Sequence, residues 1–492
     1  MSAQNKVLAF DFGASSGRAM LFSFDGETLS MEEMHRFSND PVLVGGSFHW
    51  DILRLFHEIK TGILKTINAG HRDIMSIAFD TWGVDYGLFD EKGKLLGNPY
   101  HYRDTRTDGM IEKADKEVGK KYIFDHTGIQ FNFFNTIFQL IAARDDSSLK
   151  SAKHLLFIPD IFNYFLTGEM KNEYTEASTS QLLNPYKKEW DAELMKKLNI
   201  PTEIFKDIIH PGETVGYLTD ELCEELGCPK IPVIAVGSHD TASAVASVPV
   251  TEDYPYAYIR SGTWALMGSE LDKPEITDSS YKYNFTNEGG VCGKIRFLKN
   301  IMGLWIVQEC RRQWAREGKE FSFADLGQAA RGATPFRSFI NPDDQSFATP
   351  GNMPRRIREF CEKTGQYVPE TEGEIIRCAM ESLAFKCRMV TEALEDVQGK
   401  SLEVIHMLGG GIQDTLLCEF ISCATKKKVA AGPVEATSTG NAVIQYMALG
   451  KIASLAEARK IIANSFPIKH YQPKDNDAWD TAYEQYKKYV QF

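Results

Sequence analysis

A carboxylate beside a run of small residues lies near the start of the chain, in FDFGASSGRAML at residues 10–21. Two enzyme signatures overlap there: DFG is the metal-binding motif of protein kinases, and GASSG fits the G-x-S-x-G nucleophile elbow of hydrolases. The elbow requires a helix after its turn, whereas residues 18–24 have the composition of a strand. The kinase motif requires an HRDxxxxN loop before it, and none precedes Asp11. The stretch therefore predicts two strands joined by a Gly/Ser-rich turn.

The chemistry that suits such a hairpin is phosphate and metal binding. Gly, Ala and Ser side chains leave the backbone N–H groups of the turn accessible to phosphate oxygens. Asp11, at the end of the first strand, would serve Mg²⁺, which takes one or two carboxylates together with water and substrate phosphates. An ordinary glycine-turned hairpin is the alternative, and this stretch alone leaves both open.

A second candidate is IPVIAVGSHDTASAV at residues 231–245, where a buried strand breaks at Gly237 and an Ala-rich helix begins. Asp240 at that helix start has two interpretations. An Asp in this position is commonly a helix N-cap. A carboxylate at a strand end of an α/β fold also points into the ligand crevice, where a general base can reach a substrate hydroxyl.

Two further stretches are weaker signals. VIHMLGGGIQDTLLCEF at residues 404–420 places three glycines between a strand and a helix, so a flat ring or a phosphate could lie against the backbone. In FDTWGVDYGLFD, residues 79–90, and HYRDTRT, residues 101–107, Trp82 could pack on a sugar while Asp85, Arg103 and Asp104 bond hydroxyls. The alternatives are a tight strand–helix turn for the first stretch, and a core Trp with a solvated charged face for the second.

Strands and helices alternate along the chain, which indicates an α/β architecture. The pattern predicts strands at residues 6–12, 18–24, 74–79, 84–89, 231–236 and 403–408, and helices at residues 51–64, 188–198 and 374–390. YAYIRSGTWALMGSE at residues 256–270 repeats the plan of the opening hairpin, and residues 74–79 and 84–89 form another such pair. The repeat predicts duplicated domains facing each other, joined near residues 245–253.

Composition excludes several classes of protein. A chain of 492 residues exceeds one ordinary core, so we expect two or three domains. The net charge is -12 and no basic stripe occurs, which argues against a nucleic-acid partner. The start of the sequence has no signal-peptide pattern and no apolar run could span a bilayer, so we expect a cytoplasmic protein without a membrane partner. The nine cysteines lack zinc spacing and are expected to be reduced.

Taken together, the motifs resemble those of the FGGY carbohydrate kinases, a family of the actin-like ATPase superfamily. The series covers nearly the whole chain: FDFGASSGRAML, FDTWGVDYGLFD, YRDTRT, GIQFNFFNTIFQL, PDIFNYFLTGEM, SHDTASAV, SGTWALMG, FTNEGG, LKNIMGLW, FINPDD, LGGGIQDTLL and AGPVEA. The resemblance implies two α/β, actin-like (ribonuclease H-like) domains with a catalytic cleft between them. Residues 1–247 would bind sugar and phosphates and supply the base, and residues 248–492 would bind the nucleotide.

The resemblance also implies a role for particular residues. Asp240 would be the general base, and Asp11 would hold Mg²⁺ through water. The sugar would be bound by Gly83, His239, Asp240, Thr241 and Asn300. ATP would be bound by Ala14, Ser15, Ser16, Gly17, Arg18, Thr263, Gln308 and Gly410.

The implied activity is transfer of phosphate from MgATP to the carbon-1 hydroxyl of a ketose, with L-rhamnulose as the substrate that the full series of motifs implies. Many family members carry a Lys and a Trp in the segment where this chain has NTIFQ at residues 135–139, and this departure argues against the sugars of those members. L-Fuculose or another ketose remains an alternative, as does a non-catalytic, nucleotide-dependent binding module. We expect a monomer or a homodimer, with the sugar and ATP as its small-molecule partners.

Overall fold

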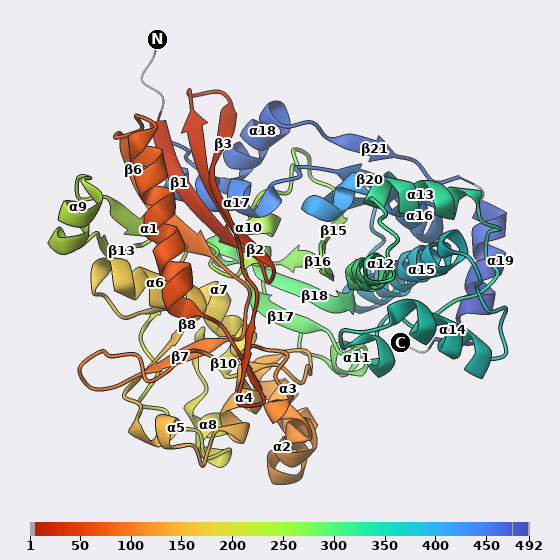
Figure 1. Ribbon diagram of the computed structural model, residues 1–492, viewed down its shortest axis with the longest axis horizontal. Coiled ribbons are helices and arrows are strands. Elements are labelled where there is room, and N and C mark those ends of the chain that lie inside the picture. Colours follow the sequence, from red (N-terminus) through yellow and green to blue (C-terminus); the bar gives the residue numbers. More distant parts are fainter. Residues whose placement is uncertain (1–4, 475, 491–492) are drawn as a thin grey trace. The chain divides into compact units, whose positions relative to one another are not determined.

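The computed structural model describes residues 5–474 and 476–490 (Figure 1). By internal contacts the chain forms two compact units, and each is assembled from three stretches of sequence. Unit 1 consists of Met1–Thr251, Glu270–Phe297 and Ala436–Ser465. Unit 2 consists of Glu252–Ser269, Leu298–Glu435 and Phe466–Phe492.

Unit 1 contains a six-stranded sheet in the order β13-β14-β6-β1-β2-β3. β1 pairs antiparallel with β2 and parallel with β6, and β6 pairs parallel with β14. The strands are β1 (Asn5–Phe12), β2 (Ser16–Phe24), β3 (Leu29–Ser38), β6 (Ile74–Asp80), β13 (Thr214–Tyr217) and β14 (Pro232–Ile234). The helices are α1 (Ile52–Asn68), α2 (Met110–Val118), α3 (Lys120–Thr127), α4 (Thr136–Ala142), α5 (Ser147–Ser151), α6 (Ile158–Thr167), α7 (Tyr174–Ala177), α8 (Ala192–Lys197), α9 (Asp220–Leu226), α10 (Asp240–Ala246), α11 (Asp278–Lys282), α17 (Ala436–Ala448) and α18 (Leu455–Ser465).

The second large sheet follows the same plan, in the order β17-β18-β16-β15-β19-β20-β21. β15 pairs antiparallel with β16 and parallel with β19, which pairs parallel with β20. These strands are β15 (Tyr256–Ser261), β16 (Trp264–Leu271), β17 (Thr286–Gly289), β18 (Ile295–Met302), β19 (Val404–Leu408), β20 (Lys428–Ala431) and β21 (Lys469–Tyr471). The helices of unit 2 are α12 (Trp305–Arg316), α13 (Phe323–Gly332), α14 (Met353–Lys363), α15 (Glu372–Gln398), α16 (Thr415–Thr425) and α19 (Asn476–Tyr486). The shared order and direction of strands confirm the predicted duplication.

Alternation along β1 and β6 determines which side chains meet which helices, because successive residues of a strand point to opposite faces. Phe10, Phe12 and Phe79 join the core cluster that contains residues of α1. Asp11 and Asp80 point to the other face, where they contact side chains of α17. The same alternation therefore builds a core on one face and a polar site on the other.

The long helix α15 illustrates how the sequence specifies a helix. Thr371 accepts a hydrogen bond from the backbone N–H of Glu374, whose carboxylate bonds back to Thr371 N, which is a capping box. The apolar face expected at this helix is buried and consists of Ile376, Ala379, Met380, Leu383, Ala384 and Cys387.

Two expected elements differ in the structure. Residues 84–89 do not form a hairpin with β6, because β7 (Tyr86–Phe89) pairs with β8 (His154–Phe157) in a separate sheet. Val84 has a φ of 69°, so the chain turns sharply before this strand. Residues 188–198 are not one helix: β11 (Glu189–Trp190) precedes α8, and Asp191 caps α8 by accepting from the N–H of Leu194. Among the described residues, no helix is long and apolar enough to cross a membrane.

Helices α10 and α17 of unit 1 pack against each other at a glycine. A Cβ atom added to Gly440 of α17 would lie 1.7 Å from the carbonyl oxygen of Ser243 in α10. The obstacle is backbone, which cannot swing aside as a side chain can. The two helices that carry Asp240 and the partners of Asp11 and Asp80 therefore depend on the missing side chain for their close approach.

We expect Gly440→Ala to destabilise the protein by about 3 kcal/mol, the upper end for overpacked interiors. A lower melting temperature in calorimetry would measure this loss. Gly327→Ala in α13 is the matched control, since its Cβ would meet nothing within 4 Å. That control should be neutral or slightly stabilising, because Ala is favoured over Gly inside helices by roughly 0.5–1 kcal/mol. Equal melting temperatures for the two variants would contradict the packing argument.

Candidate active site

The carboxyl ends of β1 and β6 and the start of α10 meet in unit 1. Asp11 and Asp80 are partners in the parallel register of β1 and β6. Thr81 continues this edge: its N–H donates to Ser238 O at 2.8 Å, and its carbonyl accepts from Asp240 N at 2.8 Å. The backbone therefore holds Asp240 beside the end of β6.

Asp240 is the first residue of α10, and the N-cap position before it belongs to His239. The Asp240 side chain is largely buried, with 8% of its residue surface exposed. Its Oδ1 accepts a hydrogen bond from Thr241 Oγ1 at 2.9 Å. The predicted trio of His239, Asp240 and Thr241 thus forms one continuous turn at the site.

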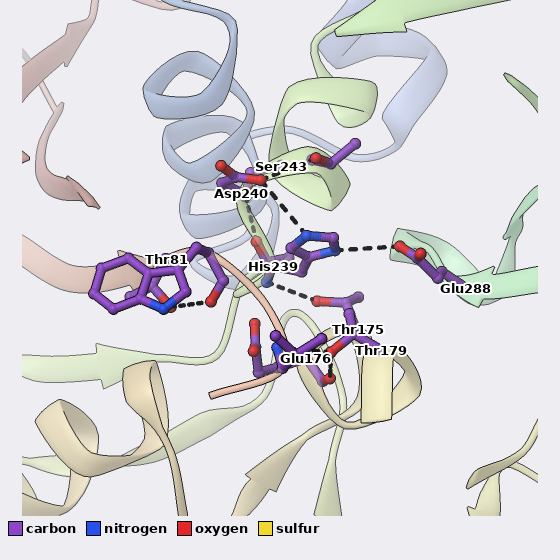
Figure 2. A network of polar contacts seen from close by, with 12 residues as sticks. Thr81, Thr175, Glu176, Thr179, His239, Asp240, Ser243 and Glu288 are labelled. Atoms are coloured by element: carbon purple, nitrogen blue, oxygen red, sulfur yellow. Dashed lines mark hydrogen bonds and ion pairs between the residues drawn. The ribbon is translucent and has the colours of Figure 1, made fainter. Parts of the chain in front are cut away.

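The imidazole of His239 lies between Asp240 and Glu288 (Figure 2), and Glu288 forms a buried ion pair with Arg296. The Nε2 atom of the imidazole lies 3.6 Å from Asp240 Oδ1, and its Nδ1 lies 3.4 Å from Glu288 Oε2. Arg296 Nη2 also contacts Nδ1, at 3.0 Å, while Arg296 Nη1 lies 3.1 Å from Glu288 Oε2. Sequence reasoning assigned no role to Glu288 or Arg296, although Glu288 lies in the quoted motif FTNEGG.

Gly83 lies close to the imidazole of His239. A Cβ at this position would lie 3.1 Å from Thr179 Cγ2 and 3.3 Å from His239 Nε2. Both distances are tighter than ordinary van der Waals contact, so a side chain here would push against the ring. The structure therefore brings Gly83 together with the predicted residues of α10.

Asp11 and Asp80 form a pair of neighbouring carboxyl groups. Asp11 Oδ2 accepts from Ser438 Oγ at 3.1 Å and lies 3.3 Å from Arg18 Nε. Asp80 Oδ2 accepts from Asn441 Nδ2 at 2.6 Å, and its Oδ1 is buried without a hydrogen-bond partner. Burial, followed by the charge of Asp11, raises the pKa of Asp80 well above its ordinary value. Sequence reasoning missed Asp80, although it ends its strand as Asp11 does.

The opening hairpin has the predicted form. Gly13 N donates to Ser16 O at 2.9 Å across the turn, and Asn39 Nδ2 donates to Gly13 O at 2.8 Å. Ala14, Ser15 and Arg18 are exposed or half-buried. Gly17 is buried instead, and a Cβ there would lie 2.3 Å from Cζ of Phe37. Ring packing is thus the reason for glycine at residue 17.

In unit 2, the turn between β15 and β16 is bound to the start of α12. Thr263 O accepts from the N–H groups of Gly303 and Trp305, at 3.1 and 3.2 Å. The Thr263 hydroxyl donates to Gln308 Oε1 at 3.4 Å. The structure therefore brings Thr263 and Gln308 together. Asn300 lies on β18, the neighbour of β16 in the sheet.

The three glycines after β19 have different structural reasons. Gly409 has a φ of 84°, which favours glycine. A Cβ on Gly411 would lie 2.1 Å from Ser261 Oγ, whereas a Cβ on Gly410 would meet nothing within 4 Å. Gly410 is thus the exposed member of the loop, and a ligand could lie against its backbone.

Trp82 is a core residue, as one of the two alternatives predicted, but the charged residues near it do not form the solvated face that this alternative included. Trp82 is buried against Trp50, with ring centroids 4.0 Å apart. Asp85 is not on a solvated face: its Oδ2 accepts from the indole N–H of Trp50 and of Trp82, at 2.7 and 3.0 Å. Asp104 is also buried, and it accepts from Phe48 N at 2.8 Å. These carboxylates organise the polypeptide around the site.

Comparison with known proteins identifies the class of enzyme. Residues 6–246 match the N-terminal domain of the FGGY family of carbohydrate kinases, and residues 257–449 match its C-terminal domain. The chain therefore belongs to the FGGY family of carbohydrate kinases. It is a sugar kinase with ATP as its co-substrate, as the sequence predicted.

Within the family, curated proteins similar to this chain include rhamnulokinases. That of Bacteroides thetaiotaomicron is 45% identical over 489 residues, which are 99% of this chain and 100% of the relative. That of Bacillus subtilis is 40% identical over 469 residues, 95% of this chain and 96% of the relative.

Solved structures confirm the two-domain α/β kinase fold. A xylulose kinase from Lactobacillus acidophilus superposes with a TM-score of 0.82 at 16% identity, covering 98% of this chain and 97% of that one. The glycerol kinase of Plasmodium falciparum with ADP gives a TM-score of 0.79 at 16% identity, covering 99% of each chain. At such identities the likeness concerns the fold alone.

Two glutamates lie behind the site on the segment that precedes and forms α7. Glu173 is well satisfied, because its carboxylate accepts from Thr175 N, Thr175 Oγ1, Glu176 N and Ser238 N. Both carboxyl oxygens of Glu176 are buried without a hydrogen-bond partner. Burial, followed by the charges of Asp160 and Glu173, raises the pKa of Glu176 well above its ordinary value. We therefore expect Glu176 to be neutral in the folded protein near pH 7.

Glu176→Gln should stabilise the protein at alkaline pH. A carboxyl group whose pKa is higher in the folded state favours folding below its unfolded value, near 4.5, and that stability is lost as the pH rises above it. The gap between variant and wild type should therefore widen from pH 5 to pH 8, by at most about 1.4 kcal/mol per pH unit.

Denaturant midpoints at the two pH values measure this gap. Exposed Glu203→Gln is the control for loss of a charge alone, and its gap should not widen. If Glu176→Gln is the less stable protein at pH 8, the prediction is wrong, and Glu176 is ionised in the folded protein and stabilised by other groups.

Proposed function

We propose that this chain transfers the γ-phosphoryl group of ATP to the carbon-1 hydroxyl of L-rhamnulose, giving L-rhamnulose 1-phosphate and ADP, in the breakdown of L-rhamnose. Similarity to rhamnulokinases along nearly the full length supports this substrate. The observation that carries the chemistry is the position of Asp240, which backbone hydrogen bonds hold beside the end of β6 and next to the imidazole of His239.

Asp240 would act as the general base. Its carboxylate accepts the proton of the carbon-1 hydroxyl while that oxygen forms a bond to the γ-phosphorus. The bond between the γ-phosphorus and the oxygen of the departing ADP breaks in the same displacement. Phosphoryl transfer leaves little covalent work to a protein, so the remaining residues act by positioning and by charge stabilisation.

The sugar would be held by Gly83, His239, Thr241 and Asn300 together with Asp240. His239 and Thr241 flank the base on the same turn, so they can bond hydroxyl groups near carbon 1. A pocket that bonds specific hydroxyls discriminates strongly against sugars that lack them.

The phosphates of ATP would lie on the opening hairpin, at Ala14, Ser15, Ser16, Gly17 and Arg18. The rest of the nucleotide would contact Thr263, Gln308 and Gly410 of unit 2. We assign residues 1–247 as the sugar and phosphate domain and residues 248–492 as the nucleotide domain.

The residues present fit a Mg²⁺ site at Asp11. Among the described residues, no cluster of three or more His, Cys, Asp or Glu side chains is arranged to hold a metal on its own. Mg²⁺ does not require one, since it retains water and binds substrate phosphates. Asp80, with one buried oxygen lacking a partner, would support the same ion. Bound there, Mg²⁺ would neutralise charge on the phosphates.

We further propose a cytoplasmic enzyme that works as a monomer or homodimer.

Among ketoses, L-rhamnulose should give the highest specificity constant. L-Fuculose should be poorer, and fructose should be poorer still. Release of ADP that depends on the sugar, measured over a panel that includes D-xylulose, gluconate and glycerol, tests this order. A preference for L-fuculose would move the substrate within the class, whereas a preference for glycerol or gluconate would overturn the assignment. Equal ADP release with and without any sugar would contradict a kinase.

Asp240→Asn should lower kcat by about 10²- to 10⁴-fold, the usual loss for a general base. The amide keeps the size of the side chain and can still accept from Thr241, so the melting temperature and the affinity for an ATP analogue should change little. Exposed Asp253→Asn controls for the loss of one negative charge. A folded Asp240→Asn enzyme with most of its turnover would leave the reaction without this base.

A further inference from the structure

We infer that Arg296, whose charge is balanced by Glu288, is a positioning residue that fixes His239 in the tautomer with its proton on Nε2. Asp240 is then the sole proton acceptor of the His239–Asp240 pair. This inference rests on the proposed role of Asp240 as the base.

The guanidinium group of Arg296 determines which nitrogen of the His239 ring carries the proton. Arg296 is completely buried, and its Nε donates to Gly289 O at 2.8 Å, which fixes the plane of the group. Its Nη2 lies 3.0 Å from His239 Nδ1. An arginine side chain can only donate hydrogen bonds. Nδ1 must therefore present its lone pair, and a neutral imidazole then carries its proton on Nε2.

Glu288 favours the opposite tautomer, because its Oε2 lies 3.4 Å from the same Nδ1 and can only accept when ionised. Arg296 is the closer partner of Nδ1, and it also lies 3.1 Å from Glu288 Oε2. Burial alone would raise the pKa of Glu288, but the Arg296 charge and the His239 contact hold it below its ordinary value. The carboxylate thus balances the buried guanidinium, and Arg296 supplies the hydrogen bond to the ring.

The backbone of His239 is held in place on two sides. His239 N donates to Thr175 Oγ1 at 3.2 Å, and residue 239 forms a parallel bridge with Thr81. Figure 2 shows the imidazole between Glu288 on one side and Asp240 on the other. Nε2 lies on the side of Asp240 and Gly83.

The tautomer of His239 determines which group can take the proton of the substrate. With its proton in place, Nε2 faces Asp240 Oδ1 at 3.6 Å, beyond hydrogen-bond distance. It can then donate to a sugar oxygen, and it cannot accept. In the other tautomer, a second lone pair would lie beside the base and compete for the proton and for the hydroxyl. The tautomer of a histidine is set by the partner of its other ring nitrogen, and that partner here is Arg296.

Nitrogen-15 NMR of the ligand-free protein with labelled histidine tests the inference directly, because protonated and bare ring nitrogens resonate far apart. His239→Gln identifies the signals of His239 among those of the 11 histidines. We expect a bare Nδ1 and a protonated Nε2 near pH 7.5. A neutral ring with its proton on Nδ1 would overturn the inference. The substrate does not enter this measurement, so a wrong sugar assignment cannot produce either result.

Two variants extend the test. Arg296→Met removes the donor and leaves Glu288 as the nearest partner of Nδ1, so Nδ1 should gain a proton. Adding Glu288→Gln removes both buried charges and offers an amide N–H to Nδ1, so the Nε2–H tautomer should return. An Nδ1 that stays bare in Arg296→Met, or stays protonated in the double variant, would contradict the role of Arg296. If Arg296→Met does not fold, the wild-type and double-variant spectra still decide.

Kinetics separate positioning from general stability. Turnover of L-rhamnulose should fall about 10- to 100-fold in Arg296→Met, the order expected for a misplaced catalytic group. The KM for ATP should stay within about 2-fold, because Arg296 contacts none of the residues assigned to ATP, and the double variant should recover most of the turnover. If kcat falls equally in both variants although the double variant has the wild-type tautomer, Arg296 acts otherwise than through His239.

Discussion

The site depends on the parallel register of β1 and β6, which places the carboxyl groups of Asp11 and Asp80 side by side at the ends of two buried strands. Two neighbouring acids in a buried position repel each other when both are ionised, and burial disfavours each charge. Side chains of α17 stabilise the pair, because Ser438 donates a hydrogen bond to Asp11 and Asn441 donates one to Asp80. The position of α17 against the sheet is therefore as important to the site as the hairpin itself, and Gly440 permits that position.

Close approach of backbone to backbone recurs in unit 2. A Cβ on Gly303 would lie 2.7 Å from Ala265 N, so the start of α12 can lie against the turn that contains Thr263 only because that side chain is absent. The absence of a side chain at Gly411 likewise leaves room for the side chain of Ser261. The two units thus use one sheet plan and one device: glycines at the strand ends bring the next element into contact. Such contacts are sensitive to a single methyl group.

The sequence predicted what depends on local pattern. Strand alternation, turn residues and the repeated hairpin were sufficient for β1, β2, β15 and β16 and for the duplicated α/β plan, and the motif series was sufficient for the family. Strand pairing between distant parts of the sequence could not be predicted from local pattern. Residues 84–89 have a strand pattern, yet the chain turns at the positive φ of Val84 and the strand pairs with β8. Arg296 was missed for a related reason. A lone arginine in a strand carries no local signal, and its partner His239 is distant in the sequence. The roles assigned to single site residues, the domain boundary after residue 247 and the presence of Mg²⁺ stay predictions.

The charge around Asp240 is smaller than its many acidic neighbours suggest. Buried acids surround it, but those without adequate partners are shifted toward the neutral form: burial raises the pKa of Asp80 and of Glu176. The buried cation Arg296 is neutralised by Glu288, so it adds little net charge and acts through the direction of its N–H groups. Asp240 differs from Asp80 and Glu176 in its surroundings, because its Oδ1 accepts from Thr241 Oγ1 and faces the imidazole of His239, whose ring nitrogens are held between it and the Arg296–Glu288 pair.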